Sequence, residues 1–62
     1  MLFVAEIECD NEAFESSRPI EVARILRDLA DRIANSSPDT LNFGLRDING
    51  NQVGAAEFFP ER

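Results

Sequence analysis

Apolar and polar side chains alternate along residues 2–9, Leu-Phe-Val-Ala-Glu-Ile-Glu-Cys. A repeat of two residues with one apolar face is typical of a half-buried β-strand, so we predict a strand over this segment. We expect the polar connector that follows, residues 10–17, to bury only Phe14. The apolar face of the strand consists of Phe3, Ala5, Ile7 and Cys9, and its other face of Leu2, Val4, Glu6 and Glu8.

Residues 19–34 have apolar side chains three and four positions apart, which predicts one helix with a single apolar stripe. Pro19 suits the first turn, either Ser17 or Arg18 is the expected N-cap, and Glu21 places negative charge near the positive helix end. Asn-Ser-Ser-Pro at 35–38 ends the helix. The stripe consists of Val22, Ile25, Leu26, Leu29 and Ile33. The expected surface ion pairs, each four residues apart, are Arg24–Asp28, Arg27–Asp31 and Asp28–Arg32.

Residues 40–48 and 51–59 form a predicted hairpin, because Asn49-Gly50 between them is the dipeptide typical of a two-residue type I′ turn. Both turn positions then need a positive φ. Such a turn pairs residues whose numbers sum to 99, so that large side chains meet small ones on one face. The predicted pairs on that face are Leu45 with Gly54, Phe43 with Ala56, and Leu41 with Phe58. On the opposite face they are Asn42 with Glu57 and Arg46 with Val53.

The order β-α-β-β predicts an α+β fold, a three-stranded antiparallel sheet with one helix packed on one face. Two topologies are compatible with a helix between the first two strands. We favour the strand order 2-3-1, because the third strand has the least charge and the most small residues, which suits the centre of the sheet. A chain of 62 residues has room for one domain, residues 1–62.

Composition excludes several kinds of chemistry. The chain has no His, Lys, Tyr or Trp and a single Cys, so it offers no histidine base, no Schiff-base lysine and no internal disulfide. We therefore expect no enzyme activity, no metal and no cofactor. No segment approaches the ~20 apolar residues of a membrane span, no targeting signal is visible, and one cysteine fits a reducing compartment. We expect a cytoplasmic protein that does not bind a membrane.

The net charge is −6, and most of it lies early in the chain. Residues 1–17 contain five acidic side chains and no basic one, whereas the helix is nearly neutral. Glu6 and Glu8 share one strand face, about 6.6 Å apart, and Asp10 and Glu12 continue the row if the strand runs on. Such a row resembles the spacing of every second phosphate on a nucleic-acid strand. An acidic protein prefers a basic partner to nucleic acid, although the same charges also suit a solvated sheet face.

Three further features have plainer interpretations. Cys9 lies on the apolar strand face, where we expect a buried small hydrophobe rather than a nucleophile. The Asp47–Asn51 segment contains acidic and amide side chains, but its glycine does not fit the spacing of a calcium loop, and a hairpin explains it. Apolar residues also lie on the outward sheet face, where they favour a dimer or partner contact. These are Leu2, Val4, Ile48, Val53 and Ala55.

Three stretches resemble small phage or prophage open reading frames: Ile7 to Phe14, Glu21 to Ile33, and Leu45 to Gly54. The chain is also similar to anti-CRISPR inhibitors in size, acidity and lack of catalytic side chains. That resemblance implies a stoichiometric inhibitor that binds a Cas subunit or surveillance complex and prevents it from engaging DNA.

The leading expectation is therefore a non-enzymatic binding protein that docks on a basic, nucleic-acid-binding protein surface. The expected partner-binding residues are Glu6, Glu8, Asp10, Glu12 and Glu15, with Glu57 added if the third strand neighbours the first. The alternative is a structural or accessory phage protein that forms a homodimer through its sheet face. The inhibitor hypothesis allows a monomer, and the accessory-protein hypothesis requires at least a weak homodimer.

Overall fold

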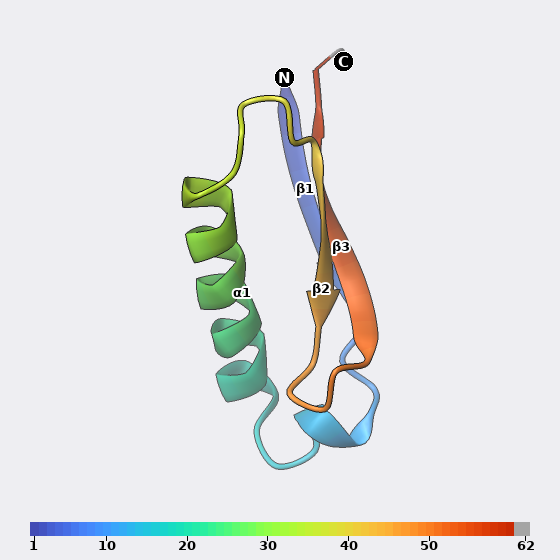
Figure 1. The fold of residues 1–62 in the computed structure, drawn as a ribbon. Helices are drawn as coiled ribbons and strands as arrows, with labels where there is room; N and C mark the ends of the chain where they lie inside the picture. The colour runs from blue at the N-terminus through green and yellow to red at the C-terminus, as the bar shows by residue number, and fades with distance from the viewer. Residues whose placement is uncertain (61–62) are drawn as a thin grey trace.

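A three-stranded antiparallel sheet carries one helix along one face, with the helix roughly parallel to the strands (Figure 1). The computed structural model describes residues 1–60. The elements are β1 (Leu2–Ile7), a short 3₁₀ helix η1 (Glu12–Phe14), α1 (Arg18–Ala34), β2 (Asn42–Arg46) and β3 (Gln52–Phe59). The sheet order β1-β3-β2 confirms the predicted α+β fold and places the third strand at the centre.

Helix α1 begins where its capping residue predicts. The Ser17 hydroxyl accepts a hydrogen bond from the Ile20 N–H at 3.4 Å, which makes Ser17 rather than Arg18 the N-cap. Ile25 and Leu29 are buried, so they form the contact of the helix with the sheet. Leu26 is 44% exposed, and its predicted place in the buried stripe is wrong. A single helix on a narrow sheet buries less than the full width of its apolar stripe.

The hydrophobic core lies between α1, η1 and the β2–β3 hairpin. Phe14 is 2% exposed, which confirms that it anchors the connector. Phe3 is 39% exposed and Ala5 is also exposed, although both belong to the predicted apolar face of the first strand. Helix α1 packs against β2, the edge opposite β1, so it leaves this part of β1 uncovered. The buried core residues are Phe14, Ile25, Leu29, Phe43, Leu45, Val53 and Ala56.

The hairpin turn differs from the predicted type I′ turn. Gly50 has a φ of +86°, but no other residue of the described chain has a positive φ, so Asn49 does not adopt the required conformation. The N–H of Gly50 donates to the Asp47 carbonyl at 3.0 Å, and the Asp47 N–H donates to the Asn51 carbonyl at 2.9 Å. These bonds enclose a three-residue loop that ends in a left-handed glycine, a common alternative to the two-residue turn.

A β-bulge restores the predicted register beyond this turn. Arg46 pairs with Gln52, one position away from the predicted partner, but the next pair is Leu45 with Gly54, as predicted. Val53 is therefore an extra residue in β3. The bulge turns its side chain into the core, where it is 8% exposed, so the predicted outward position of Val53 and its pairing with Arg46 are wrong.

The remaining hairpin pairs are as predicted. Phe43 pairs with Ala56 and Asn42 with Glu57. The Phe58 N–H donates to the Leu41 carbonyl at 2.7 Å, just outside the bounds of β2.

Gly54 also controls the contact between β3 and β1. A Cβ atom built on Gly54 would collide with the Glu6 carbonyl oxygen, which is backbone and cannot move aside alone. The two strands approach this closely because Gly54 has no side chain. Gly44 on β2 has room, since its nearest neighbour would lie 3.8 Å from an added Cβ.

Candidate functional site

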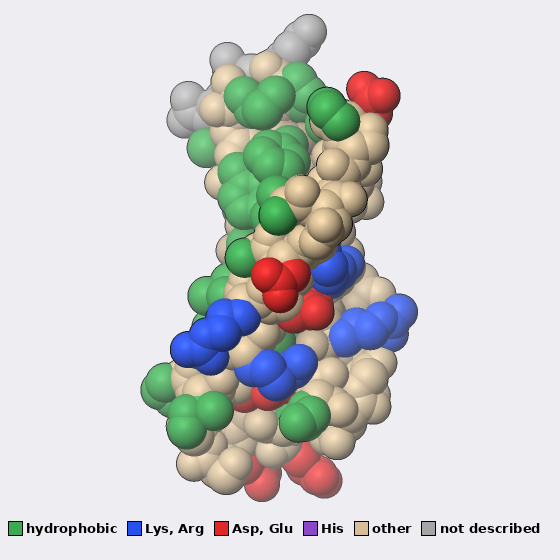
Figure 2. Space-filling view, turned by 60° about the vertical axis from the view of Figure 1, so that its left-hand side comes forward, with side chains coloured by type: hydrophobic (Ala, Val, Ile, Leu, Met, Phe, Trp, Pro, Cys, Tyr) green, Lys and Arg blue, Asp and Glu red, His purple; other side chains and the backbone are tan. Residues whose placement is uncertain are grey.

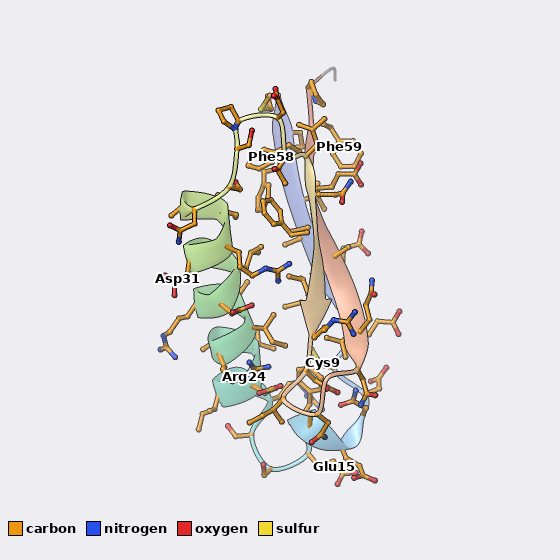
Figure 3. All side chains as sticks on the ribbon, in the orientation of Figure 1. Cys9, Glu15, Arg24, Asp31, Phe58 and Phe59 are labelled. Carbon is orange, nitrogen blue, oxygen red and sulfur yellow. The ribbon has the colours of Figure 1, made fainter. Side chains whose placement is uncertain are left out.

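The expected partner-binding carboxylates are all exposed, but they do not form one straight row. Strand β1 ends at Ile7, so the strand does not run on to carry Asp10 and Glu12 at regular spacing. Glu6 lies on β1, and Glu8 follows it, with its N–H still donating to the Val53 carbonyl at 2.8 Å. The chain then turns, and Figure 3 places Glu15 at the end of the molecule beyond the hairpin loop. We name Glu6, Glu8, Asp10, Glu12 and Glu15 the acidic surface.

None of these five carboxylates takes part in an ion pair within residues 1–60. The two ion pairs of that range join Arg24 to Glu21 and Arg32 to Asp28. Asp28–Arg32 was predicted, whereas Arg24 turns to Glu21 instead of Asp28. The predicted Arg27–Asp31 pair is not formed. Side chains of residues 1–60 therefore do not neutralise the negative charge of the acidic surface.

The turn that carries part of the acidic surface is held by Asn11. Its Oδ1 accepts the Ala13 N–H at 3.0 Å and so caps η1. Its Nδ2 donates to Oδ2 of Asp47 at 2.7 Å, which joins the turn to the hairpin loop. With Phe14 buried below, this segment has two independent anchors.

Asp47 organises the hairpin loop. The residue is 4% exposed, and its Oδ1 accepts the N–H groups of Asn49 and Asn51, both at 2.9 Å. Oδ2 accepts Nδ2 of Asn51 at 3.2 Å in addition to Asn11. Burial alone would raise the pKa of Asp47, but the hydrogen bonds from Asn51, Asn11 and Asn49 outweigh it and lower that pKa. Asp47 thus serves the loop as an acceptor of hydrogen bonds, a role that the sequence pattern did not reveal.

Glu21 joins the helix to the same loop. It is 6% exposed, and its carboxylate accepts Nε and Nη2 of Arg24 at 2.8 and 3.0 Å and the Ile48 N–H at 2.9 Å. The hydrogen bond from Arg24 lowers the pKa of Glu21 and raises that of Arg24. Sequence reasoning assigned Glu21 only to the helix dipole, because its partner Ile48 lies 27 residues away.

Two arginines of α1 reach the backbone of β2. Arg32 Nη1 donates to the Gly44 carbonyl at 2.7 Å, and Arg24 Nη2 donates to the Arg46 carbonyl at 3.1 Å. Because Leu41 bonds toward β3, the alternation of an antiparallel pair points Gly44 and Arg46 away from β3, to the free edge of the sheet. Figure 2 shows arginine side chains gathered across the middle of the helix side of the molecule.

The β1 edge has no comparable cover. Glu8 bonds toward β3, so the alternation points the N–H and C=O groups of Phe3, Ala5 and Ile7 to the free edge. Within residues 1–60, the one side chain bonded to these groups is Cys9, whose thiol lies 3.6 Å from the Ile7 carbonyl oxygen. Cys9 is half-buried against the core, so its expected full burial is only partly correct.

The face of the sheet opposite α1 is open. A hollow of about 260 Å³ lies on it between β1 and β3. Because β3 neighbours β1, Glu57 lies on this face next to Val4, which meets the condition set for including it. Phe58 and Phe59 lie on opposite sides of the sheet, as Figure 3 shows, so Phe59 adds an apolar side chain to the open face. The residues that line the hollow are Val4, Glu6, Ala55, Glu57 and Phe59.

A second hollow of about 260 Å³ lies on the helix side of the sheet, between the C-terminus of α1 and the start of β2. It is largely apolar and includes Ile33, Pro38, Leu41 and Phe58. Phe58 also packs on Phe3, with ring centroids 4.6 Å apart. No pattern in the sequence pointed to this hollow, because its lining comes from four separate segments.

The chain matches no protein-family model, no curated protein and no solved structure. Within residues 1–60, no helix has the length and apolar character needed to cross a membrane. The same residues contain no group of three or more Cys, Asp or Glu side chains placed to hold a metal ion.

Proposed function

We propose that this protein is a non-enzymatic inhibitor that docks its acidic surface on a basic, nucleic-acid-binding surface of a bacterial defence complex. The expected target is a Cas subunit or surveillance complex, which the bound protein prevents from engaging DNA. The acidic surface binds directly, and Glu57 contributes from the adjacent strand. The choice of target follows from the resemblance of the chain to anti-CRISPR inhibitors in size and acidity.

One observation carries the proposal. Five carboxylates lie exposed on β1 and the turn after it, without an ion pair inside residues 1–60, while two of the arginines on α1 are engaged with carboxylates and strand carbonyls. The molecule therefore presents uncompensated negative charge over one region. Charge of one sign attracts a partner of the opposite sign, accelerates association and makes binding sensitive to salt.

The first test counts plaques of a test phage on bacteria whose CRISPR system is active. Expression of the wild-type protein is expected to restore plaques, and the Glu6→Gln/Glu8→Gln variant is expected to lose that effect. The matched control is Asp31→Asn/Asp39→Asn, which removes the same charge from exposed positions outside the acidic surface. Restoration by both variants would move the interface elsewhere. Failure of the wild type across several CRISPR types would overturn the inhibitor proposal.

A second candidate function is a homodimer through the open sheet face. It is favoured by the exposure of Leu2 and Phe59, which are 38% and 39% exposed and lie opposite one another in the β1–β3 pair. Sedimentation equilibrium tests it, because Val4→Lys should convert a dimer to a monomer. An unchanged mass in that variant would exclude this face as the dimer contact.

A further inference from the structure

We propose that β1 binds an extended, basic segment of a partner protein, which joins the sheet as a fourth strand. This inference rests on the proposed function, because it specifies the chemistry of the basic partner and how that partner is held.

The backbone of β1 offers the pattern that an added strand requires. Phe3, Ala5 and Ile7 point their N–H and C=O groups away from β3. Every second residue of β1 therefore offers one donor and one acceptor to a strand at this edge. A partner strand that bonds to such a row gains affinity from its main chain. Strand β2 is a poorer site, since Arg32 and Arg24 already occupy the outward carbonyls of Gly44 and Arg46.

The side chains of β1 define which strand fits. On the open face, Glu6 and Glu8 are exposed and form no ion pair with any residue from 1 to 60. A neighbouring strand would place its own side chains about 5 Å away. Arg or Lys at alternate positions would complement these carboxylates. On the helix side, the exposed Phe3 and Ala5 remain to be covered, which calls for apolar residues between the basic ones. The fitting segment therefore alternates basic and apolar residues.

Charge disfavours a second copy as the occupant of this edge. Pairing β1 with itself would bring together two segments, residues 1–17, that each contain five acidic side chains and no basic one. Like charges on neighbouring strands destabilise their pairing. A basic segment removes that repulsion and replaces it with attraction.

The test uses the full chain and two synthetic peptides. In one peptide Arg and Val alternate, and in the other the same residues are grouped so that all Arg precede all Val. At about 50 mM salt, the alternating peptide is expected to bind at least about tenfold more tightly than the grouped one. Its binding should slow hydrogen exchange at the amides of Phe3, Ala5 and Ile7, because these become hydrogen-bonded.

Two variants test the edge directly. Ala5→Pro removes one outward N–H without removing a bond to β3, and it should weaken binding of the alternating peptide at least about tenfold. Ala5→Ser retains the N–H and should bind as the wild type does. If circular dichroism shows that Ala5→Pro does not fold, the exchange pattern of the wild type decides.

The contrary results separate strand addition from electrostatic docking and from self-association. Equal binding of the two peptides would overturn strand addition and leave electrostatic docking in place. Binding without protection of the three amides would do the same. A doubled mass of the free protein that persists in Val4→Lys, with no binding of the alternating peptide, would assign the edge to a second copy. Binding of neither peptide would contradict both strand addition and the proposed function.

Discussion

The two edges of the sheet are completed in different ways. At β2, Arg24 and Arg32 cross from α1 and donate hydrogen bonds to carbonyls that point out of the sheet. At β1, the outward groups of Phe3 and Ala5 have no such partner within residues 1–60, and exposed carboxylates lie beside them. An uncovered edge is a site where another strand can pair, whereas a covered edge resists that pairing. The difference supports our proposal that β1 contacts a partner, whereas the arginine contacts at β2 hold the helix to the sheet.

Gly54→Ala should have the largest effect on the free energy of unfolding, because Gly54 lies at the closest approach of β3 to β1. The added methyl group would collide with the Glu6 carbonyl, and backbone on both sides must move. We expect a loss of about 3 kcal/mol in the free energy of unfolding, measured by urea denaturation. Gly44→Ala is the matched control, since space is available there, and it should change stability by less than about 1 kcal/mol. Similar losses in the two variants would contradict the close approach at Gly54.

Acid should weaken the hydrogen bonds that hold the hairpin loop to the rest of the fold. Glu21 and Asp47 have lowered pKa values in the folded protein, so the folded state binds fewer protons than the unfolded state. Their contribution is complete above the unfolded pKa values, near pH 4, and is lost as the pH falls through the lower folded values.

The urea midpoint should therefore fall below about pH 4, with a shallower fall in Glu21→Gln and in Asp47→Asn. An identical pH dependence in the wild type and both variants would show that these carboxylates do not stabilise the fold.

Removing the cover of β2 should make the two edges more alike. Arg24→Gln/Arg32→Gln loses two hydrogen bonds to strand carbonyls together with both ion pairs of the described chain. Both arginine side chains are 39% exposed, so we expect a modest loss of about 1–2 kcal/mol. Arg18→Gln/Arg27→Gln carries the same charge change at exposed positions and should leave the urea midpoint nearly unchanged. Equal effects in the two pairs would mean that charge, not the edge contact, matters.

Neutralising the carboxylates beside β1 should have the smallest effect on stability. In Glu6→Gln/Glu8→Gln the thermal midpoint should shift by no more than about 3 °C, because both side chains are exposed and neither forms an ion pair in the described part of the chain. Binding of a basic partner should nevertheless fall. A large loss of stability would assign these carboxylates to the fold and would weaken their proposed role in docking.

Local patterns predicted the elements well. Ser17 and the three-four spacing after it located α1, and alternation located β1. The pairing of Leu45 with Gly54 was predicted correctly from an incorrect turn, because the longer loop and the bulge at Val53 shift the register by one residue in opposite directions. Such compensation is invisible in a sequence, since the two shifts cancel in every predicted pair except that of Arg46 with Val53.

The sequence predicted that the carboxylates of the acidic surface are exposed, but it did not predict how they are arranged in space. The five carboxylates of residues 1–17 are exposed, yet the row bends where β1 ends at Ile7. Residue spacing alone did not show that Asn11 would cap η1 and bond to Asp47, 36 positions later. The sequence also did not predict which sheet edge would have its outward carbonyls bonded. That depends on the distance between the arginine side chains of α1 and the carbonyls of β2 in the folded protein.

By itself, the sequence determined the order β-α-β-β, the absence of histidine and lysine chemistry, and the concentration of acidic residues before the helix. These properties depend on residue type and on spacing within a few positions, where backbone geometry repeats. The burial of Val53, the bond from Glu21 to the hairpin loop and, within residues 1–60, the cover of β2 but not of β1 arise from tertiary packing. Each of these depends on atoms from segments distant in the chain, whose approach is set by the packing of α1 on the sheet.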